Sequence, residues 1–173
     1  MTARVAVTGM AGLTSLGHDY DSVIDAMDAR RSGVRFMEEW ARYDGLNTHL
    51  AGPIADFALP EHYPRKKIRS MGRVASLAVV ATEGALKGAG LLESDVVSNG
   101  DCGVAYGSSS GSPDAIADFG AMLNEKSTRM INSTSYIRMM SHTAAVNTSL
   151  FFNIRGRLIS TSTACTSGSQ AIG

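Results

Sequence analysis

Short runs of β-branched and small apolar residues alternate along this chain with longer segments of helical character. Three runs have the length and composition of strands, and they are Arg4–Val7, Cys102–Gly107 and Arg157–Ala164. Strands that alternate with helices favour a sheet covered by helices over an all-β fold or a helical bundle. The order strand, helix, strand, helix, strand therefore predicts an α/β layered fold across all 173 residues.

The segments between these runs contain helix boundaries and helical spacing. Helices are predicted over 19–33, 69–90, 112–123 and 141–152, with a short strand within 48–54. Gly33 is expected near the C-terminal cap of the first helix. Ser112 is expected to cap the third, because Pro113 and Asp114 follow it. Ser141 is expected to cap the fourth. The second helix is apolar or small on nearly every face, which predicts burial on more than one side.

Composition excludes several classes of protein. Sixteen basic residues balance sixteen acidic ones, so no overall charge attracts nucleic acid or an anionic membrane. The most apolar run, Leu77–Ala81, is too short to span a bilayer, and the N-terminus lacks the apolar stretch of a secretory signal. Two cysteines without CxxC spacing and four scattered histidines predict neither a disulfide framework nor a metal site. We expect a reduced, cytoplasmic protein that contacts neither nucleic acid nor membrane.

Two glycine-rich stretches are candidates for anion sites. Gly12 and Gly17 have the gap of a phosphate-binding loop, but His18 and Asp19 occupy the positions of its Lys and Ser/Thr. This stretch is therefore predicted to be a plain turn, and no cofactor is expected. The Gly/Ser loop over 106–114 could offer backbone N–H groups to an anion, although composition favours an ordinary loop followed by a helix cap.

The last fourteen residues, STSTACTSGSQAIG, place Cys165 between a predicted strand and a small-residue helix start. A cysteine at a helix N-terminus gains from the helix dipole and the free N–H groups, which favour the thiolate. Cysteines are also common as inert core residues, so the pattern alone leaves the two interpretations about even. Cys102 lies inside an apolar run and is predicted to be a core residue.

Four positive charges fall within Pro64–Arg69 of a chain with no net charge. A charge run of this kind is usually a solvated face. The alternative is a docking patch for an acidic partner. Composition alone favours the solvated face.

The segment STACTSG, Ser162–Gly168, closely resembles the nucleophile motif of the β-ketoacyl-acyl carrier protein synthases, the elongating condensing enzymes of fatty acid and polyketide synthesis. Other segments resemble the same family in the same order: RVAVTGMAGLTSLG, RRSGVRFMEEW, YGSSSGS and NIRGRLISTSTACTSG. The resemblance covers the whole chain and implies the thiolase fold, a layered α-β-α-β-α sandwich of two similar halves. Residues 1–173 would form the N-terminal half, truncated just after the nucleophile.

In such an enzyme Cys165 is the nucleophile that accepts an acyl chain as a thioester, with its own backbone N–H as one oxyanion donor. Malonyl-acyl carrier protein then loses CO2 and condenses with that thioester. The family's catalytic histidines and lysine lie in the second half, so the resemblance gives no role to His18, His49, His62 or His142. The 173 residues alone are expected to be inactive.

The resemblance also implies partners and binding residues. Arg65, Lys66 and Arg69 match the segment with which the family docks acyl carrier protein, and this match favours the docking patch. Ser110 falls where the family often carries a bulky residue beside the acyl pocket, which implies a roomier or more polar pocket here. A homodimer or a ketosynthase heterodimer is expected. The alternatives are a non-catalytic partner subunit, which usually lacks the cysteine, and a coenzyme A-dependent thiolase, which the basic segment disfavours.

Overall fold

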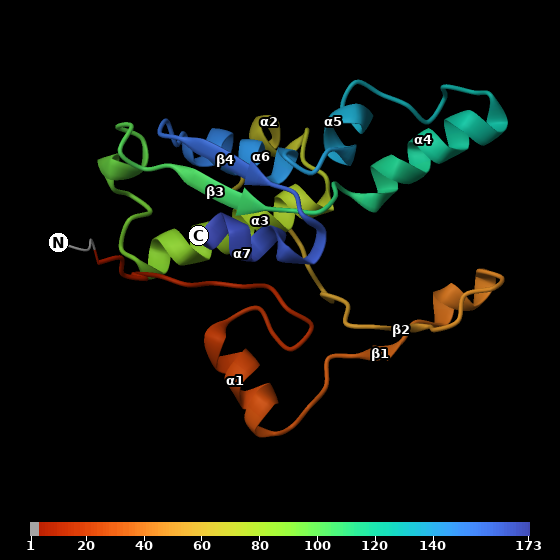
Figure 1. Cartoon of the computed structure of the whole chain (residues 1–173), viewed down its shortest axis with the longest axis horizontal. Coiled ribbons are helices and arrows are strands. Elements are labelled where there is room, and N and C mark those ends of the chain that lie inside the picture. The colour runs from red at the N-terminus through yellow and green to blue at the C-terminus, as the bar shows by residue number, and fades with distance from the viewer. Residues whose placement is uncertain (1–3) are drawn as a thin grey trace. The chain divides into compact units, whose positions relative to one another are not determined.

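The computed structural model describes residues 4–173 and divides them into two units. One unit consists of Leu59–Gly173 together with the segment that ends at Gly9, and the other is Met10–Ala58. Both are drawn in Figure 1. The larger unit contains the residues that the sequence singles out, and the smaller one contains a helix and a short hairpin.

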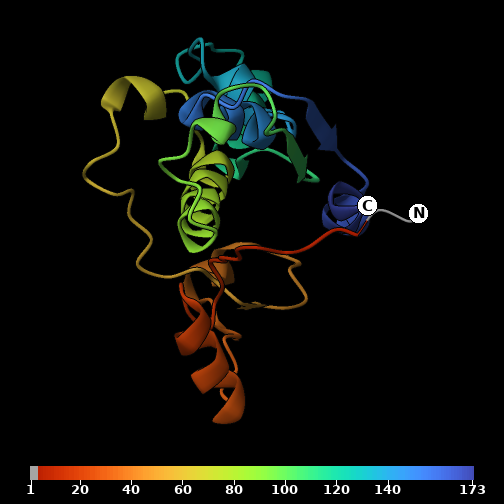
Figure 2. The ribbon, with the colours of Figure 1, turned by 90° about the vertical axis from the view of Figure 1, so that its left-hand side faces the viewer.

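The larger unit is built on two parallel strands, β3 (Val104–Gly107) and β4 (Leu158–Thr161). Val104 pairs with Leu158, and Gly107 pairs with Thr161. Helices α6 (Thr143–Phe152) and α7 (Ser167–Ile172) contact both strands. Side chains alternate along β3: Val104 and Tyr106 pack with Ala145 of α6, while Gly107 faces α7. The two helices therefore cover opposite faces of the strand pair, as Figure 2 shows.

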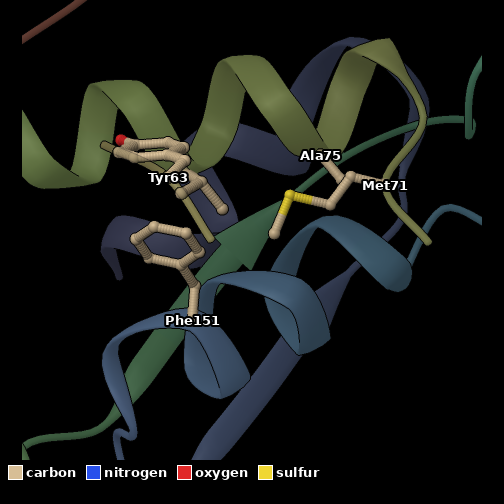
Figure 3. Close-up of a cluster of buried hydrophobic side chains, with 5 residues drawn as sticks. Tyr63, Met71, Ala75 and Phe151 are labelled. Carbon is tan, nitrogen blue, oxygen red and sulfur yellow. The ribbon is translucent and has the colours of Figure 1, made fainter. Parts of the chain in front are cut away.

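Helix α3 (Arg73–Gly88) packs on α6 and encloses the first hydrophobic core. This core consists of Tyr63, Met71, Ala75, Val79 and Phe151. The rings of Tyr63 and Phe151 lie 4.4 Å apart between centroids (Figure 3). The Tyr63 hydroxyl donates a hydrogen bond of 2.8 Å to Glu83, and burial together with this carboxylate raises the pKa of Tyr63 well above its ordinary value.

A second core lies between α6 and the strands and contains Val97, Val104, Ala145 and Ile154. Cys102 packs against it, partly buried just before β3, which is consistent with the core role predicted for it.

The predicted burial of the long helix α3 is also confirmed, since among its residues only Arg73, Lys87 and Gly88 are exposed. The large exposed apolar side chains of this unit lie elsewhere, with Val5 96%, Val7 78% and Ile172 91% exposed.

Four further helical segments of this unit are α2 (Arg65–Ile68), the 3₁₀ turn η2 (Asp95–Val97), α4 (Pro113–Glu125) and α5 (Ser135–Met139). Of these four, only α4 is longer than two turns. Helix α4 begins at the proline that the sequence marks as its start. Ser112 is the N-cap residue of α4, as predicted, but its side chain forms no capping hydrogen bond with that helix. Ser112 Oγ accepts a hydrogen bond of 3.1 Å from the N–H of Val74 and so caps the first turn of α3.

This cross-helix cap requires glycine at residue 72, the residue before α3. A Cβ atom there would lie 2.2 Å from Ser112 Oγ and 2.7 Å from Ser112 Cβ, closer than real Cβ atoms come to their neighbours. The start of α3 and the loop after β3 are therefore locked together by two residues far apart in the sequence.

The smaller unit contains α1 (Tyr20–Asp28), β1 (Arg35–Phe36), the 3₁₀ turn η1 (Glu38–Arg42) and β2 (Leu50–Ala51). β1 and β2 are antiparallel, and β2 confirms the short strand predicted within 48–54. Asp19 caps α1 by accepting the Ser22 N–H at 2.8 Å, and this hydrogen bond lowers the pKa of Asp19.

The prediction that Gly33 follows the end of α1 is wrong. Arg30 adopts the left-handed conformation (φ 52°), and the helix therefore ends before it.

Two further predictions on local structure are wrong. Arg4–Val7 is extended but is not a strand, because no strand in the part of the chain described here pairs with it. Helix α6 begins at Thr143, so its N-cap is His142 rather than the predicted Ser141. The short helix α5 comes before it. Across residues 4–173 no helix is both long enough and apolar enough to cross a membrane.

Candidate active site

Cys165 lies in a one-turn 3₁₀ helix, η3 (Ala164–Thr166), that joins the end of β4 to α7. Its side chain is exposed. The preceding residue, Ala164, has φ 49°, a left-handed conformation that costs an L-residue about 1–2 kcal/mol. The chain therefore turns sharply at this point and presents the thiol at the surface.

Ser167 holds this turn in place. Its side chain is 4% exposed, and its Oγ accepts the N–H of Thr163 at 2.9 Å and donates to the carbonyl of Ala164 at 2.7 Å. The Thr161 hydroxyl donates to the Ser167 carbonyl at 2.7 Å. These three hydrogen bonds connect both sides of Cys165 to the end of β4, and they offset the strain at Ala164.

Gly107 allows the turn to approach β3. A Cβ atom at this position would lie 2.1 Å from the Ser167 carbonyl oxygen and 2.6 Å from the Gly168 nitrogen. Both atoms belong to the backbone of α7, so no change of rotamer could relieve the contact. The position of the cysteine turn therefore depends on glycine at residue 107.

The groups around Cys165 are neutral and polar. Thr166 Oγ1 donates to the Thr163 carbonyl at 2.8 Å, and Thr163 Oγ1 donates to Gln170 Oε1 at 2.9 Å. In the described part of the chain no histidine forms a hydrogen bond or ion pair with this turn. His62 contacts Glu83 at 3.0 Å instead, and His142 precedes α6. No cluster of three metal-ligating side chains occurs within residues 4–173.

Ser110 is exposed in the loop that follows β3. The N–H of Ser108 donates to the carbonyl of Thr161 at 3.0 Å, which ties this loop to the end of β4. Because β3 and β4 are parallel, the Ser110 loop and the Cys165 turn leave the same end of the strand pair. Parallel sheets commonly bind ligands at this end of their strands.

The basic segment faces a groove of about 630 Å³, separate from the cysteine turn. Its lining residues are Arg65, Lys66, Ile68, Arg69 and Arg138. The structure thus brings together the three basic residues that the sequence singles out. It adds Arg138 from α5, which sequence reasoning missed because no local pattern reveals a contact between residues so far apart.

Lys67 belongs to the same basic segment but lies outside the groove. Its Nζ donates to the carbonyl of Phe151 and sits 5.1 Å from the centroid of the Phe151 ring. This lysine therefore stabilises the packing of α2 on α6, whereas its neighbours point toward the groove.

Exposure predicts which thiol reacts first. Limiting iodoacetamide is expected to alkylate Cys165 before Cys102, because Cys165 is exposed whereas Cys102 is partly buried against the second core. Peptide mapping by mass spectrometry after short incubations measures the order, and the pH dependence of the rate reports whether the thiol is activated. Equal labelling of the two cysteines, or earlier labelling of Cys102, would contradict the prediction.

Comparison with known proteins identifies the family of this chain. The family model described as "Beta-ketoacyl synthase, N-terminal domain" matches residues 2–173. The crystal structure of a beta-ketoacyl synthase from Burkholderia phymatum STM815 is 50% identical in sequence and superposes with a TM-score of 0.94, covering 99% of this chain and 42% of that one. The chain therefore belongs to the beta-ketoacyl synthase family. The α/β class and the thiolase-type fold predicted from the sequence are confirmed.

Two relatives define how much of such a protein this chain represents. The 3-oxoacyl-[acyl-carrier-protein] synthase 1 of Haemophilus influenzae is 28% identical, and synthase 2 of Vibrio harveyi is 33% identical. Each match covers 98% of this chain but only 41% and 40%, respectively, of the relative. The chain thus spans about two fifths of the length of these relatives.

Proposed function

We propose that residues 1–173 are the nucleophile-bearing N-terminal half of a 3-oxoacyl-acyl carrier protein synthase of the elongating type. The observation that carries the proposal is the exposed Cys165 on a turn fixed by Ser167, in a chain that belongs to this family. The names of the two relatives specify an acyl carrier protein synthase, and the proposal extends that activity to the full-length protein.

The reaction uses Cys165 twice. Its thiolate attacks the thioester carbonyl of an acyl-carrier protein, the acyl group moves to sulfur, and the carrier leaves as a thiol after taking up a proton. Malonyl-carrier protein then loses CO2, and the resulting carbanion attacks the Cys165 thioester. This step forms the new carbon–carbon bond and releases the Cys165 thiolate with 3-oxoacyl-carrier protein. The backbone N–H of Cys165 stabilises the oxyanion of each tetrahedral intermediate.

Carrier docking and acyl selection complete the proposal. The groove that contains Arg65, Lys66 and Arg69 is lined by cations, which suits steering of an acidic carrier protein. Ser110 borders the acyl chain, and its exposed position at the strand end shared with Cys165 supports this role. Leu158 and Ile159 of β4 are 41% and 40% exposed, which supports a dimer that covers this strand.

The test is turnover by the full-length protein. Incubation with an acyl-carrier protein and malonyl-carrier protein is expected to release CO2 and to yield a 3-oxoacyl-carrier protein that is two carbons longer in its acyl chain, measured by intact-protein mass spectrometry. The 173-residue chain alone is expected to give no product. Equal turnover of coenzyme A thioesters without a carrier would favour a thiolase instead. Absence of product in the full-length protein would contradict the proposed function.

A further inference from the structure

Arg138 connects α5 to the basic segment, although 69 residues separate it from Arg69. Its Nη2 donates a hydrogen bond of 2.8 Å to the Arg69 carbonyl, at the C-terminal cap of α2. Carbonyl oxygens at a helix C-terminus carry partial negative charge, so a guanidinium is favourable there. This bond holds Arg138 beside Arg69 at the edge of the groove.

The same guanidinium keeps donors for a partner. It carries five N–H groups, and the bond to Arg69 uses one of them. Nε of Arg138 is shielded from solvent and has no hydrogen-bond partner among the residues described. This shielded Nε cannot be reached from the groove, so a carboxylate there would bind the remaining N–H groups on the terminal nitrogens of Arg138.

Charge defines what the groove can bind. Four of its five lining residues are cationic, the fifth is Ile68, and none of the lining residues is acidic. Neighbouring like charges repel, and the repulsion is relieved when anionic groups enter the groove. Ile68 adds an apolar contact at the centre of the basic segment, which suits a protein surface better than a small anion.

We propose that Arg138 is a further partner-contacting residue, which completes the groove formed with Arg65, Lys66 and Arg69 and binds a carboxylate on the acidic face of the carrier protein. This inference rests on the proposed function, because that function supplies the partner. The inference goes beyond the proposed function in two ways. It names a residue of α5, outside the basic segment, and it gives this residue a direct contact with the partner in addition to its hydrogen bond to the Arg69 carbonyl.

The test measures binding of full-length protein to apo-carrier protein, which lacks the phosphopantetheine arm, at several salt concentrations. Arg138→Gln is expected to raise the dissociation constant about two- to fivefold at low salt and to lower the salt dependence of binding. Arg138→Lys keeps the charge and is expected to retain the salt dependence. A merely structural role would weaken binding equally at all salt concentrations.

Matched variants separate this inference from the proposed docking. The triple variant Arg65→Gln, Lys66→Gln, Arg69→Gln tests the groove. Lys87→Gln removes one exposed charge in the last turn of α3, outside the groove, and is expected to leave the salt dependence unchanged.

The outcomes are distinct. If the triple variant weakens binding and Arg138→Gln does not, docking at the groove stands and the role of Arg138 is wrong. If neither changes binding, both are wrong. Binding that requires the phosphopantetheine arm would also overturn the inference, because the acidic face of the carrier protein would then not be sufficient for docking at the groove.

Discussion

Replacement of Cys165 by Ala is expected to abolish condensation by the full-length synthase, with a loss on the order of 10⁴-fold or more in turnover. Alanine has no atom that can hold the acyl group, so the reaction loses its covalent intermediate. The side chain is exposed, and its removal therefore leaves the packing of the turn unchanged. The variant is expected to unfold at the same urea concentration as the parent protein.

The measurement has two parts. Mass spectrometry after incubation with an acyl-carrier protein is expected to show an acyl adduct on the parent protein and none on Cys165→Ala. Cys102→Ala is the matched control, because it removes the other thiol while leaving the proposed nucleophile Cys165 in place, and it is expected to retain the adduct. An acyl adduct on the Cys165→Ala protein, or its loss on Cys102→Ala, would show that the nucleophile has been assigned wrongly.

Replacement of Gly107 by Ala is expected to lower the free energy of unfolding by about 1–3 kcal/mol and to displace the cysteine turn. The added Cβ would lie 2.1 Å from the Ser167 carbonyl oxygen, so α7 must move away from β3. That movement breaks the contacts through which Ser167 fixes Cys165. Urea unfolding measures the stability, and the rate of Cys165 alkylation reports the change in the turn.

Gly168→Ala is the control for this substitution. Gly168 lies in α7, three residues after Cys165, and a Cβ atom there meets no other atom within 4 Å. Alanine favours helix over glycine, so this variant is expected to be unchanged or stabilised by up to about 1 kcal/mol. If Gly107→Ala proves as stable as Gly168→Ala, with the same alkylation rate, the close approach of α7 to β3 does not constrain the site.

Local patterns were sufficient to predict the elements on which the site depends. β-branched runs indicated β3 and β4, and the proline after Ser112 indicated the start of α4. The small residues around Cys165 indicated the turn into a helix, and the structure has that turn. These features depend on residues close together in the sequence, which is why periodicity and composition reveal them.

Features that depend on distant residues could not be predicted in this way. Arg4–Val7 has the composition of a strand, but pairing requires a neighbouring strand, and the described structure supplies none. Lys66 and Lys67 are identical in type and adjacent, yet only the packing of α2 on Phe151 separates their roles. Arg138 is held at the groove by a hydrogen bond to the backbone carbonyl of Arg69. Every residue has such a carbonyl, so the sequence does not indicate which one Arg138 contacts.

The cap shared between Ser112 and α3 restricts how this sequence can change over time. A side chain at residue 72 would collide with both Cβ and Oγ of Ser112, so even alanine at residue 112 leaves too little room. Only glycine at 112 would open the space, and that change first removes the cap on Val74. A side chain at residue 72 therefore requires glycine at residue 112, whereas residue 112 can change alone with only the loss of the cap on Val74. Residues 72 and 112 form an epistatic pair, and mutational libraries of this chain gain folded members when the two positions are varied together.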